Sequence, residues 1–192
     1  MHQRRSIRLQ GYDYASPGGY YITLLAHQRI CLFGDIRDGQ SILNPFGEIV
    51  LEEWLRTPEI RPEIILDEYV IMPNHLHAIL FITDHTPPVR AHGSAPHGSA
   101  PHGSAPHGSA PPVRVDGSPP HGSPPQPPPQ RPPKSLASLI AGYKSIVTKR
   151  INLLRNTPGA PVWQRNYYEH IIRDEQDLNR IRAYIRNNPL RW

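Results

Sequence analysis

The 192-residue chain has one cysteine, three phenylalanines and no long apolar run. A single thiol, Cys31, cannot form a disulfide within the chain, which excludes the disulfide-stapled scaffolds of small secreted proteins. The basic start is not followed by an apolar stretch, so we expect no signal peptide. Because no stretch of about 18 apolar residues occurs, we expect no membrane span. These absences together predict a cytoplasmic protein.

Acidic residues are scarce in the last third of the chain. Residues 134–192 contain 11 Lys and Arg against 4 Asp and Glu, whereas residues 1–83 contain 7 against 10. The net charge of +5 at pH 7 therefore comes mostly from the C-terminal third. This concentration of positive charge indicates an anionic partner, with nucleic acid the leading candidate. On charge alone, a soluble basic surface without a partner is the alternative.

Large apolar side chains are almost absent between residues 84 and 133. This segment holds 16 of the 24 prolines and 4 copies of His-Gly-Ser-Ala-Pro between His92 and Pro111. Such a composition cannot offset the entropy cost of ordering, so we predict a disordered, partly polyproline-II insert. We interpret its regularly spaced histidines as solvated residues of an expanded repeat. Residues 1–83 and 134–192 are then predicted to form one domain together.

The remainder of the chain alternates between strand and helix patterns. Residues rich in β-formers or in short apolar runs predict strands over 19–26, 64–72, 75–82 and 162–172. Helical spacing of apolar residues predicts helices over 46–56, 136–154 and 174–187. The order β-α-β-β-α-β-α predicts an α+β fold, a ferredoxin-like antiparallel sheet with helices on one face and an extra C-terminal helix.

Two histidines stand side by side in the third predicted strand. Because side chains alternate along a strand, His75 and His77 point to one face, while Leu76 and Ala78 point to the core. Two imidazoles on one face can ligate one divalent cation. A pair of half-buried structural histidines is the alternative.

A tyrosine stands on the last predicted helix. Arg180, Tyr184 and Asn188 follow one another at intervals of four and share a helix face. A phenol can attack phosphorus and form a covalent phosphoester, especially beside a metal-bound phosphate. Asn188 could supply an amide oxygen as a third metal ligand, or it could cap the helix before Pro189. A packed aromatic at a helix edge is the alternative for Tyr184.

These motifs together resemble a known family. His75-Leu76-His77 after Met72-Pro73-Asn74 resembles the HUH motif of single-tyrosine transposases. The segments Val162–Arg173 and Tyr184–Pro189 resemble the "WQ…(D/E)HxxR" and "YIxxNP" blocks of REP-associated tyrosine transposases. The resemblance covers nearly all of the chain except residues 84–133, which are not part of the family pattern.

The resemblance implies a DNA cleavage and rejoining enzyme of DNA transposition. It implies a metal held by His75, His77 and Asn188, with Tyr184 as the nucleophile that forms a 5′-phosphotyrosine. The expected cofactor is Mg²⁺ or Mn²⁺. The expected partner is single-stranded DNA of hairpin or palindromic form, bound by a monomer or a homodimer. The expected phosphate contacts are the basic residues Arg4, Arg5, Arg8, Lys144, Lys149, Arg165, Arg173, Arg180 and Arg186.

Two other functions stay open from the sequence. A non-catalytic single-stranded DNA- or RNA-binding protein would use exposed aromatics on a ferredoxin-like sheet, but it leaves the histidine pair without a role. A metal hydrolase would use the pair and leave Tyr184 incidental. The sequence offers it few further ligands, because the other core histidines stand alone.

Overall fold

The structure is a computed structural model that describes residues 16–84 and 134–192. The predicted insert from residue 85 to residue 133 lies outside the described residues, as do Arg4, Arg5 and Arg8. In chain order, the elements are β1 (Gly18–Leu25), η1 (His27–Arg29), β2 (Gly34–Arg37), β3 (Gln40–Leu43), α1 (Pro45–Leu55), α2 (Thr57–Ile60), β4 (Ile64–Met72), β5 (His75–Ile82), α3 (Leu136–Leu154), β6 (Tyr168–Ile172), α4 (Glu175–Arg186) and η2 (Pro189–Arg191).

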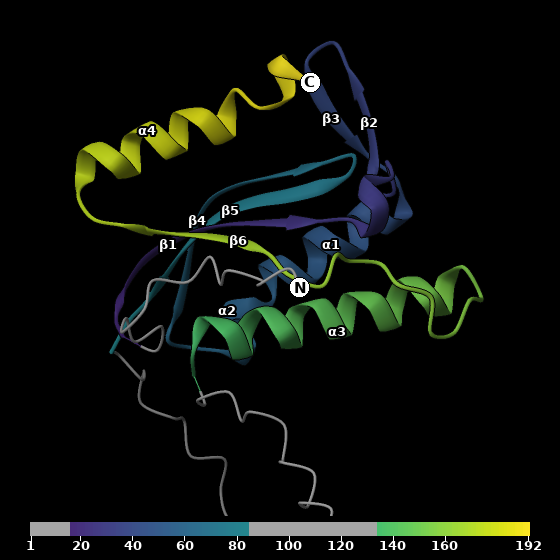
Figure 1. Cartoon of the computed structure of the whole chain (residues 1–192), viewed down its shortest axis with the longest axis horizontal. Helices are drawn as coiled ribbons and strands as arrows, with labels where there is room; N and C mark the ends of the chain where they lie inside the picture. The colour runs from purple at the N-terminus through teal and green to yellow at the C-terminus, as the bar shows by residue number, and fades with distance from the viewer. Residues whose placement is uncertain (1–15, 85–133) are drawn as a thin grey trace, which may run out of the picture. The chain divides into compact units, whose positions relative to one another are not determined.

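The main sheet has the strand order β4-β5-β1-β6, and every neighbouring pair is antiparallel. Leaving aside the β2–β3 hairpin, the chain runs β-α-β-β-α-β-α, which confirms the predicted ferredoxin-like α+β fold. Helices α1 and α3 cover one face of the sheet, and α4 crosses the other (Figure 1). The sheet therefore separates a two-helix layer from the helix that contains Tyr184.

Alternation along the strands decides which residues meet each helix layer. In β5, Leu76, Ala78 and Leu80 enter the larger core beneath α1 and α3. On the other face, Ile79 packs with Ile181 of α4 in a smaller cluster. This division confirms the predicted inward direction of the strand's aliphatic residues. The two histidines therefore lie on the α4 side of the sheet, where the apolar cluster is the smaller one.

Side-chain caps define where three helices begin. Asn44 accepts hydrogen bonds from the backbone amides of Phe46 and Gly47 at the start of α1. Ser135 and Asp174 cap α3 and α4 in the same way. Each cap satisfies amide groups that have no partner within the first helical turn. The start of α4 is thereby fixed two residues after β6 ends, which directs this helix back over the sheet.

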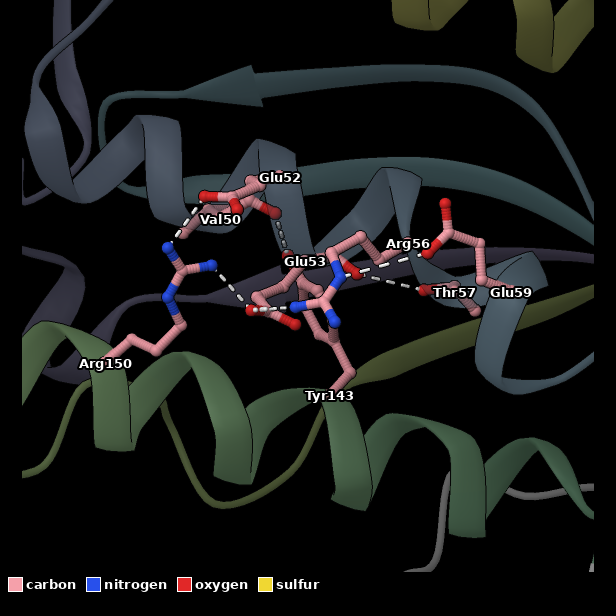
Figure 2. Close-up of polar contacts among 8 residues, drawn as sticks. All are labelled: Val50, Glu52, Glu53, Arg56, Thr57, Glu59, Tyr143 and Arg150. Carbon is pink, nitrogen blue, oxygen red and sulfur yellow. Dashed lines mark hydrogen bonds and ion pairs between the residues drawn. The ribbon is translucent and has the colours of Figure 1, made fainter.

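A buried carboxylate ties α1 to α3 (Figure 2). Glu53 is 3% exposed, and its Oε1 accepts from Arg150 at 2.6 Å and from Arg56 at 3.3 Å. The hydroxyl of Tyr143 donates to the carbonyl of Val50 at 2.8 Å. The side chains of Arg150 and Arg56 are 32% and 49% exposed, so solvent screens both ion pairs. These contacts nevertheless give the buried carboxylate partners, which gives the cluster a structural role in the helix layer.

The structure differs from the sequence-based expectation at the β2–β3 hairpin, at the short helix α2 and at the last strand. The β2–β3 hairpin was not predicted, because its strands are short and contain few apolar residues. Its turn is Asp38-Gly39, with φ of 50° and 71°, a type of two-residue turn that joins antiparallel strands. The last strand was predicted from residue 162 but begins at Tyr168. Val162 and Trp163 instead enter the core, and Trp163 makes only an isolated bridge to Ala26.

In the described part of the chain, none of the helices has the length and apolar character needed to cross a membrane.

Candidate functional site

His75 and His77 lie on β5 and face α4, as their spacing predicts. Their ring centroids are 4.4 Å apart, and the rings meet edge to face. His77 is 6% exposed, whereas His75 is half-buried. The pairing of β1 with β5 sets Thr23 opposite His77, and Tyr21 lies two residues away on the same face. The two imidazoles thus lie beside the side chains of the neighbouring strand β1, on the same face of the sheet.

Both imidazoles have hydrogen-bond partners at Nδ1. Nδ1 of His77 lies 2.8 Å from the Tyr21 hydroxyl and 2.8 Å from Thr23 Oγ1. Nδ1 of His75 lies 2.6 Å from Oδ1 of Asn74, which can only accept. Asn74 Oδ1 therefore requires a proton on Nδ1 of His75, which leaves the Nε2 lone pair of His75 for a ligand. The two hydroxyls beside His77 can accept from a protonated Nδ1 as well as donate to a bare one, so its hydrogen bonds are compatible with a ligand at Nε2. Nε2 of His75 is buried and has no hydrogen-bond partner among the described residues.

Both imidazoles are held in the neutral form. Burial lowers the pKa of His75 to about 4, against a smaller opposing effect of the Asn188 side chain. Burial and the neighbouring His75 lower the pKa of His77 to about 3. Because only a neutral imidazole binds a metal, the pair is ready for a cation at neutral pH without losing a proton.

Asn188 lies just beyond α4, beside His75. The helix ends at Arg186 with Asn187 as its C-cap, so the capping role considered for Asn188 belongs to its neighbour. The Asn188 side chain approaches the His75 ring closely enough to favour its protonated form. Within residues 16–84 and 134–192, no group of three or more His, Cys, Asp or Glu side chains could hold a metal. A third protein ligand would therefore come from another residue type, and an amide oxygen such as that of Asn188 fits.

The hydroxyl of Tyr184 lies 3.4 Å from Nε2 of His77. Its ring centroid is 5.3 Å from that of His77 and 6.4 Å from that of Tyr21. The Tyr184 side chain is 42% exposed, so an external substrate can reach it. The structure thus brings together His75, His77, Tyr184 and Asn188 from β5, α4 and the residues after α4.

Tyr21 was not predicted as a site residue. Burial raises its pKa to about 12, and Tyr184 and Tyr168 contribute in the same direction. The phenol therefore stays protonated and contacts both His77 and Tyr184. Strand alternation indicates that Tyr21 and Thr23 share one face of β1. It does not indicate which residues of β5 lie opposite them, and this register brings the two side chains to His77.

Two other tyrosines, Tyr167 and Tyr168, lie on different faces of the sheet. Tyr167 packs against the larger core, and Lys144 lies 6.0 Å from its ring centroid. Tyr168 is 47% exposed on the α4 side, with its ring centroid 6.0 Å from that of Tyr21. Of the two, only Tyr168 shares a surface with Tyr184.

A cavity of about 580 Å³ adjoins Tyr184 between β6 and α4. Its lining includes Tyr168, His170, Arg180 and Arg191, and no carboxylate is among the residues that line it. Asp177 holds His170 from outside this lining, with Nε2 of His170 2.7 Å from its Oδ2. The cavity is large enough for a nucleotide, and Arg180 and Arg191 give it positive charge, part of which Asp177 neutralises.

The predicted phosphate contacts fall in several places. Arg173 and Arg180 are exposed beside the α4 face, although Arg180 also bonds Asp177. Arg186 pairs with Glu68, with its Nη2 2.7 Å from the carboxylate. Lys144 lies on α3 and donates to the carbonyls of Gln164 and Asn166 at 2.6 and 3.2 Å. Two further predicted contacts, Lys149 on α3 and Arg165 in the loop before β6, are exposed.

Comparisons with known proteins give a relative in sequence and solved structures of similar fold. No protein-family model matches the chain. A Haemophilus influenzae protein described as "Uncharacterized protein" is 36% identical over 192 residues, which is 100% of this chain and 91% of that protein. A solved REP-associated tyrosine transposase bound to a REP hairpin has a TM-score of 0.53 at 17% identity, covering 100% of this chain and 74% of that one.

A second solved structure is more distant. A putative transposase from Deinococcus radiodurans covers 94% of this chain and 95% of that one at 12% identity. Its TM-score of 0.43 is too low to support an argument. The likeness to the REP-associated tyrosine transposase, at its low identity, shows a shared fold.

Proposed function

The chain belongs to the same family as that Haemophilus influenzae protein and has the fold of a REP-associated tyrosine transposase, and we propose that it cleaves and rejoins single-stranded DNA. One observation carries the proposal. The exposed hydroxyl of Tyr184 lies 3.4 Å from Nε2 of His77, the ring nitrogen that faces away from Tyr21 and Thr23. The proposed nucleophile and one of the proposed metal-binding atoms therefore lie next to each other.

The donor atoms fit a divalent cation. The orphaned Nε2 of His75, Nε2 of His77 and the amide oxygen of Asn188 would hold it. When bound, a cation such as Mn²⁺ or Mg²⁺ polarises the scissile phosphate and stabilises the charge that develops on it. Two nitrogen ligands favour Mn²⁺ over Mg²⁺, which prefers oxygen ligands.

The cleavage step exchanges one phosphoester bond for another. The oxygen of Tyr184 bonds to phosphorus, and the bond from phosphorus to the 3′-oxygen of the preceding nucleotide breaks. The phenol proton passes to solvent, which reaches the half-exposed ring, and the departing 3′-oxygen takes a proton from water. The product is a 5′-phosphotyrosine and a free 3′-hydroxyl. Because the ester is retained, a 3′-hydroxyl of another strand can reverse the step and join new DNA.

The proposed substrate is DNA with a hairpin next to unpaired nucleotides. The REP-associated tyrosine transposase of the same fold is bound to a REP hairpin, which supports a hairpin as the recognised element here. The basic C-terminal third of the chain supplies positive charge for its phosphates. A hairpin would place one single-stranded arm across Tyr184 while the duplex is held elsewhere.

The covalent intermediate provides the test. Tyr184→Phe removes only the hydroxyl and keeps the ring packing against His77. We expect the wild-type protein, incubated with Mn²⁺ and hairpin DNA carrying single-stranded arms, to form a nucleotide adduct that mass spectrometry maps to Tyr184. The Tyr184→Phe variant should bind the same DNA and form no adduct. Tyr168→Phe is the matched control, because it removes a neighbouring exposed hydroxyl and should keep the adduct.

Two results would overturn the assignment. An adduct on Tyr167 or Tyr168, or one that persists in Tyr184→Phe, would show that another residue attacks. Tight hairpin binding by a wild-type protein that forms no adduct with either metal would favour a non-catalytic DNA-binding protein.

A further inference from the structure

Six aromatic side chains form a series of ring contacts across the site. In order along the series they are Tyr168, Tyr21, Tyr184, His77, His75 and Trp192. Successive ring centroids lie 6.0, 6.4, 5.3, 4.4 and 6.0 Å apart. The series begins on β6, passes the proposed nucleophile and the histidine pair, and ends after η2. Tyr168 and Trp192 therefore lie on opposite sides of the proposed point of attack.

Tyr21 and His77 in the middle of this series are buried, whereas Tyr168 and Trp192 at its two ends are exposed. Tyr21 and His77 are 8% and 6% exposed, so their faces are covered. Tyr168 and Trp192 are 47% and 53% exposed. A planar ligand arriving from solvent can thus contact the two end rings and Tyr184, whereas the covered rings serve as support. Exposed aromatic rings are the surfaces on which proteins stack unpaired bases.

Tyr168 lies in a strand, and Trp192 directly follows a short 3-10 helix that packs on the β2–β3 hairpin. Tyr168 is the first residue of β6 and pairs with Thr23 of the central strand β1. Trp192 follows η2, whose Leu190 packs so closely on Gly39 that a Cβ there would lie 2.5 Å from it. The β2–β3 hairpin therefore supports the segment that brings Trp192 to His75. Rings held in this way lose little conformational freedom when a base stacks on them.

The charge around the Tyr168 end suits a nucleotide. Tyr168 lines the cavity of about 580 Å³ together with Arg180 and Arg191, and the lining contains no carboxylate. The guanidinium of Arg180 is 69% exposed, so it can meet a phosphate as well as Asp177. A nucleobase on the ring and its phosphate on the cationic wall would fill this space.

We propose that Tyr168 and Trp192 stack the two unpaired bases that flank the scissile phosphate, one on each side of Tyr184. This inference rests on the proposed function and names how the same site holds its substrate. Stacking on two fixed rings would stretch the strand across Tyr184 and present one phosphate to its hydroxyl. Because every base has a π-face, these contacts position the strand and do not read its sequence.

Binding of oligothymidylate tests the proposal without any cleavage. The full-length chain carrying Tyr184→Phe is titrated with a 12-mer of oligothymidylate at fixed salt. Of the three tryptophans, Trp54 and Trp163 are buried, so quenching of fluorescence reports on Trp192. We expect quenching that Trp192→Phe abolishes while affinity is retained. The same 12-mer containing 5-iododeoxyuridine should photocross-link to Tyr168 and Trp192.

Substitutions separate stacking from a general effect. Tyr168→Ala and Trp192→Ala should each weaken oligothymidylate binding about tenfold, and Tyr168→Phe and Trp192→Phe should restore it. Leu153→Ala is the control, because Leu153 is 82% exposed on α3, on the other face of the sheet. Unchanged affinity in both alanine variants, or cross-links confined to other residues, would overturn the proposal. An equal loss of affinity for a fully paired duplex would also overturn it.

The outcomes remain distinct from those of the proposed function. Loss of oligothymidylate binding in the two alanine variants, combined with a wild-type protein that forms no adduct, would support the stacking and reject the cleavage. An adduct on Tyr184 whose yield is unaffected by both alanine variants would support the cleavage and reject the stacking.

Discussion

The imidazole of His77 contacts three hydroxyl groups. Those of Tyr21 and Thr23 lie on its Nδ1 side, and that of Tyr184 lies on its Nε2 side. Partners of this kind on the far side of a ligating ring fix its tautomer and its orientation. The residues of β1 are therefore expected to influence metal binding although they do not reach the metal.

Tyr21→Phe should weaken Mn²⁺ binding. Without this hydroxyl, His77 keeps only Thr23 as an acceptor for its Nδ1 proton, and we expect a loss of affinity of about tenfold. Isothermal titration calorimetry with Mn²⁺ measures the change. Tyr20→Phe is the matched control. Tyr20 precedes Tyr21 in β1, points to the other face of the sheet and donates a hydrogen bond to the carbonyl of Ser16. Equal Mn²⁺ affinity in Tyr21→Phe, Thr23→Val and wild type would show that His77 is oriented by other contacts.

Acid should destabilise the metal-free protein through the same histidines. In the folded state the pKa of His75 is about 4 and that of His77 about 3, whereas an unfolded histidine titrates near 6.5. Below pH of about 6.5 the unfolded chain thus binds more protons, and the free energy of unfolding falls as pH decreases. Thermal unfolding in EDTA at pH 7.5 and pH 5 measures this loss. It should be smaller in His77→Gln, and a loss of the same size in that variant would contradict the prediction.

At the scale of elements, α4 is held on the sheet by few contacts. Ile181 and Ile185 are its buried residues, and two ion pairs link it to β4. The carboxylates of these pairs, Asp67 and Glu68, lie where the β4–β5 register shifts between Leu66 and Tyr69. Bulges of this kind redirect side chains at strand edges. The irregularity in β4 thus presents two adjacent carboxylates to the helix that positions Tyr184.

Asp67→Ala should slow adduct formation more than Glu68→Ala. Arg182 bonds both oxygens of Asp67 at 2.8 and 2.5 Å and is 30% exposed, whereas Arg186 is 62% exposed in its pair with Glu68. Exposed pairs contribute little, so Glu68→Ala is the matched control on the same bulge. We expect a single-turnover rate about tenfold lower in Asp67→Ala, because the helix no longer holds Tyr184 in place.

Hairpin DNA affinity separates positioning from unfolding in this comparison. It should be unchanged in Asp67→Ala if the ion pair only places Tyr184. Equal single-turnover rates for the two alanine variants would show that the pair of Asp67 with Arg182 does not position Tyr184.

At the scale of the whole molecule, two distant segments make one core. Residues from β1, α1, β4 and β5 pack with residues of α3 and with Trp163 in a single cluster. The segment predicted to be disordered joins β5 to α3, and its composition gives it little apolar surface to bury. The stability of the domain is therefore expected to come from the described residues.

Deleting residues 92–124 should change thermal stability little. The shorter connection has a lower closure entropy cost, worth about 1 kcal/mol in favour of folding. Differential scanning calorimetry of the full chain and the deletion variant measures the difference. A marked fall in melting temperature would mean that these residues pack on the core.

Local pattern was sufficient for several parts of the fold. The bounds of β4 and β5 match the predicted ranges, because two apolar runs are separated by Pro73-Asn74. The helical spacing of Leu178, Ile181 and Ile185 predicted the side of α4 that packs on the sheet, and Tyr184 lies at the edge of that side. The hairpin at Asp38-Gly39 was missed because its strands lack a clear alternation, although its turn residues are typical of one.

The sequence by itself determined which residues share a face, because strand and helix periods are local properties of the chain. His75 with His77, and Arg180 with Tyr184, follow from spacing alone. Only the tertiary structure decided how far apart these faces lie and what supports them. The opposition of Thr23 to His77, the contact of Tyr21 with Tyr184 and the approach of Trp192 to His75 depend on strand register and on the packing of distant segments. Both are set by burial of the whole core, which no short stretch of sequence encodes.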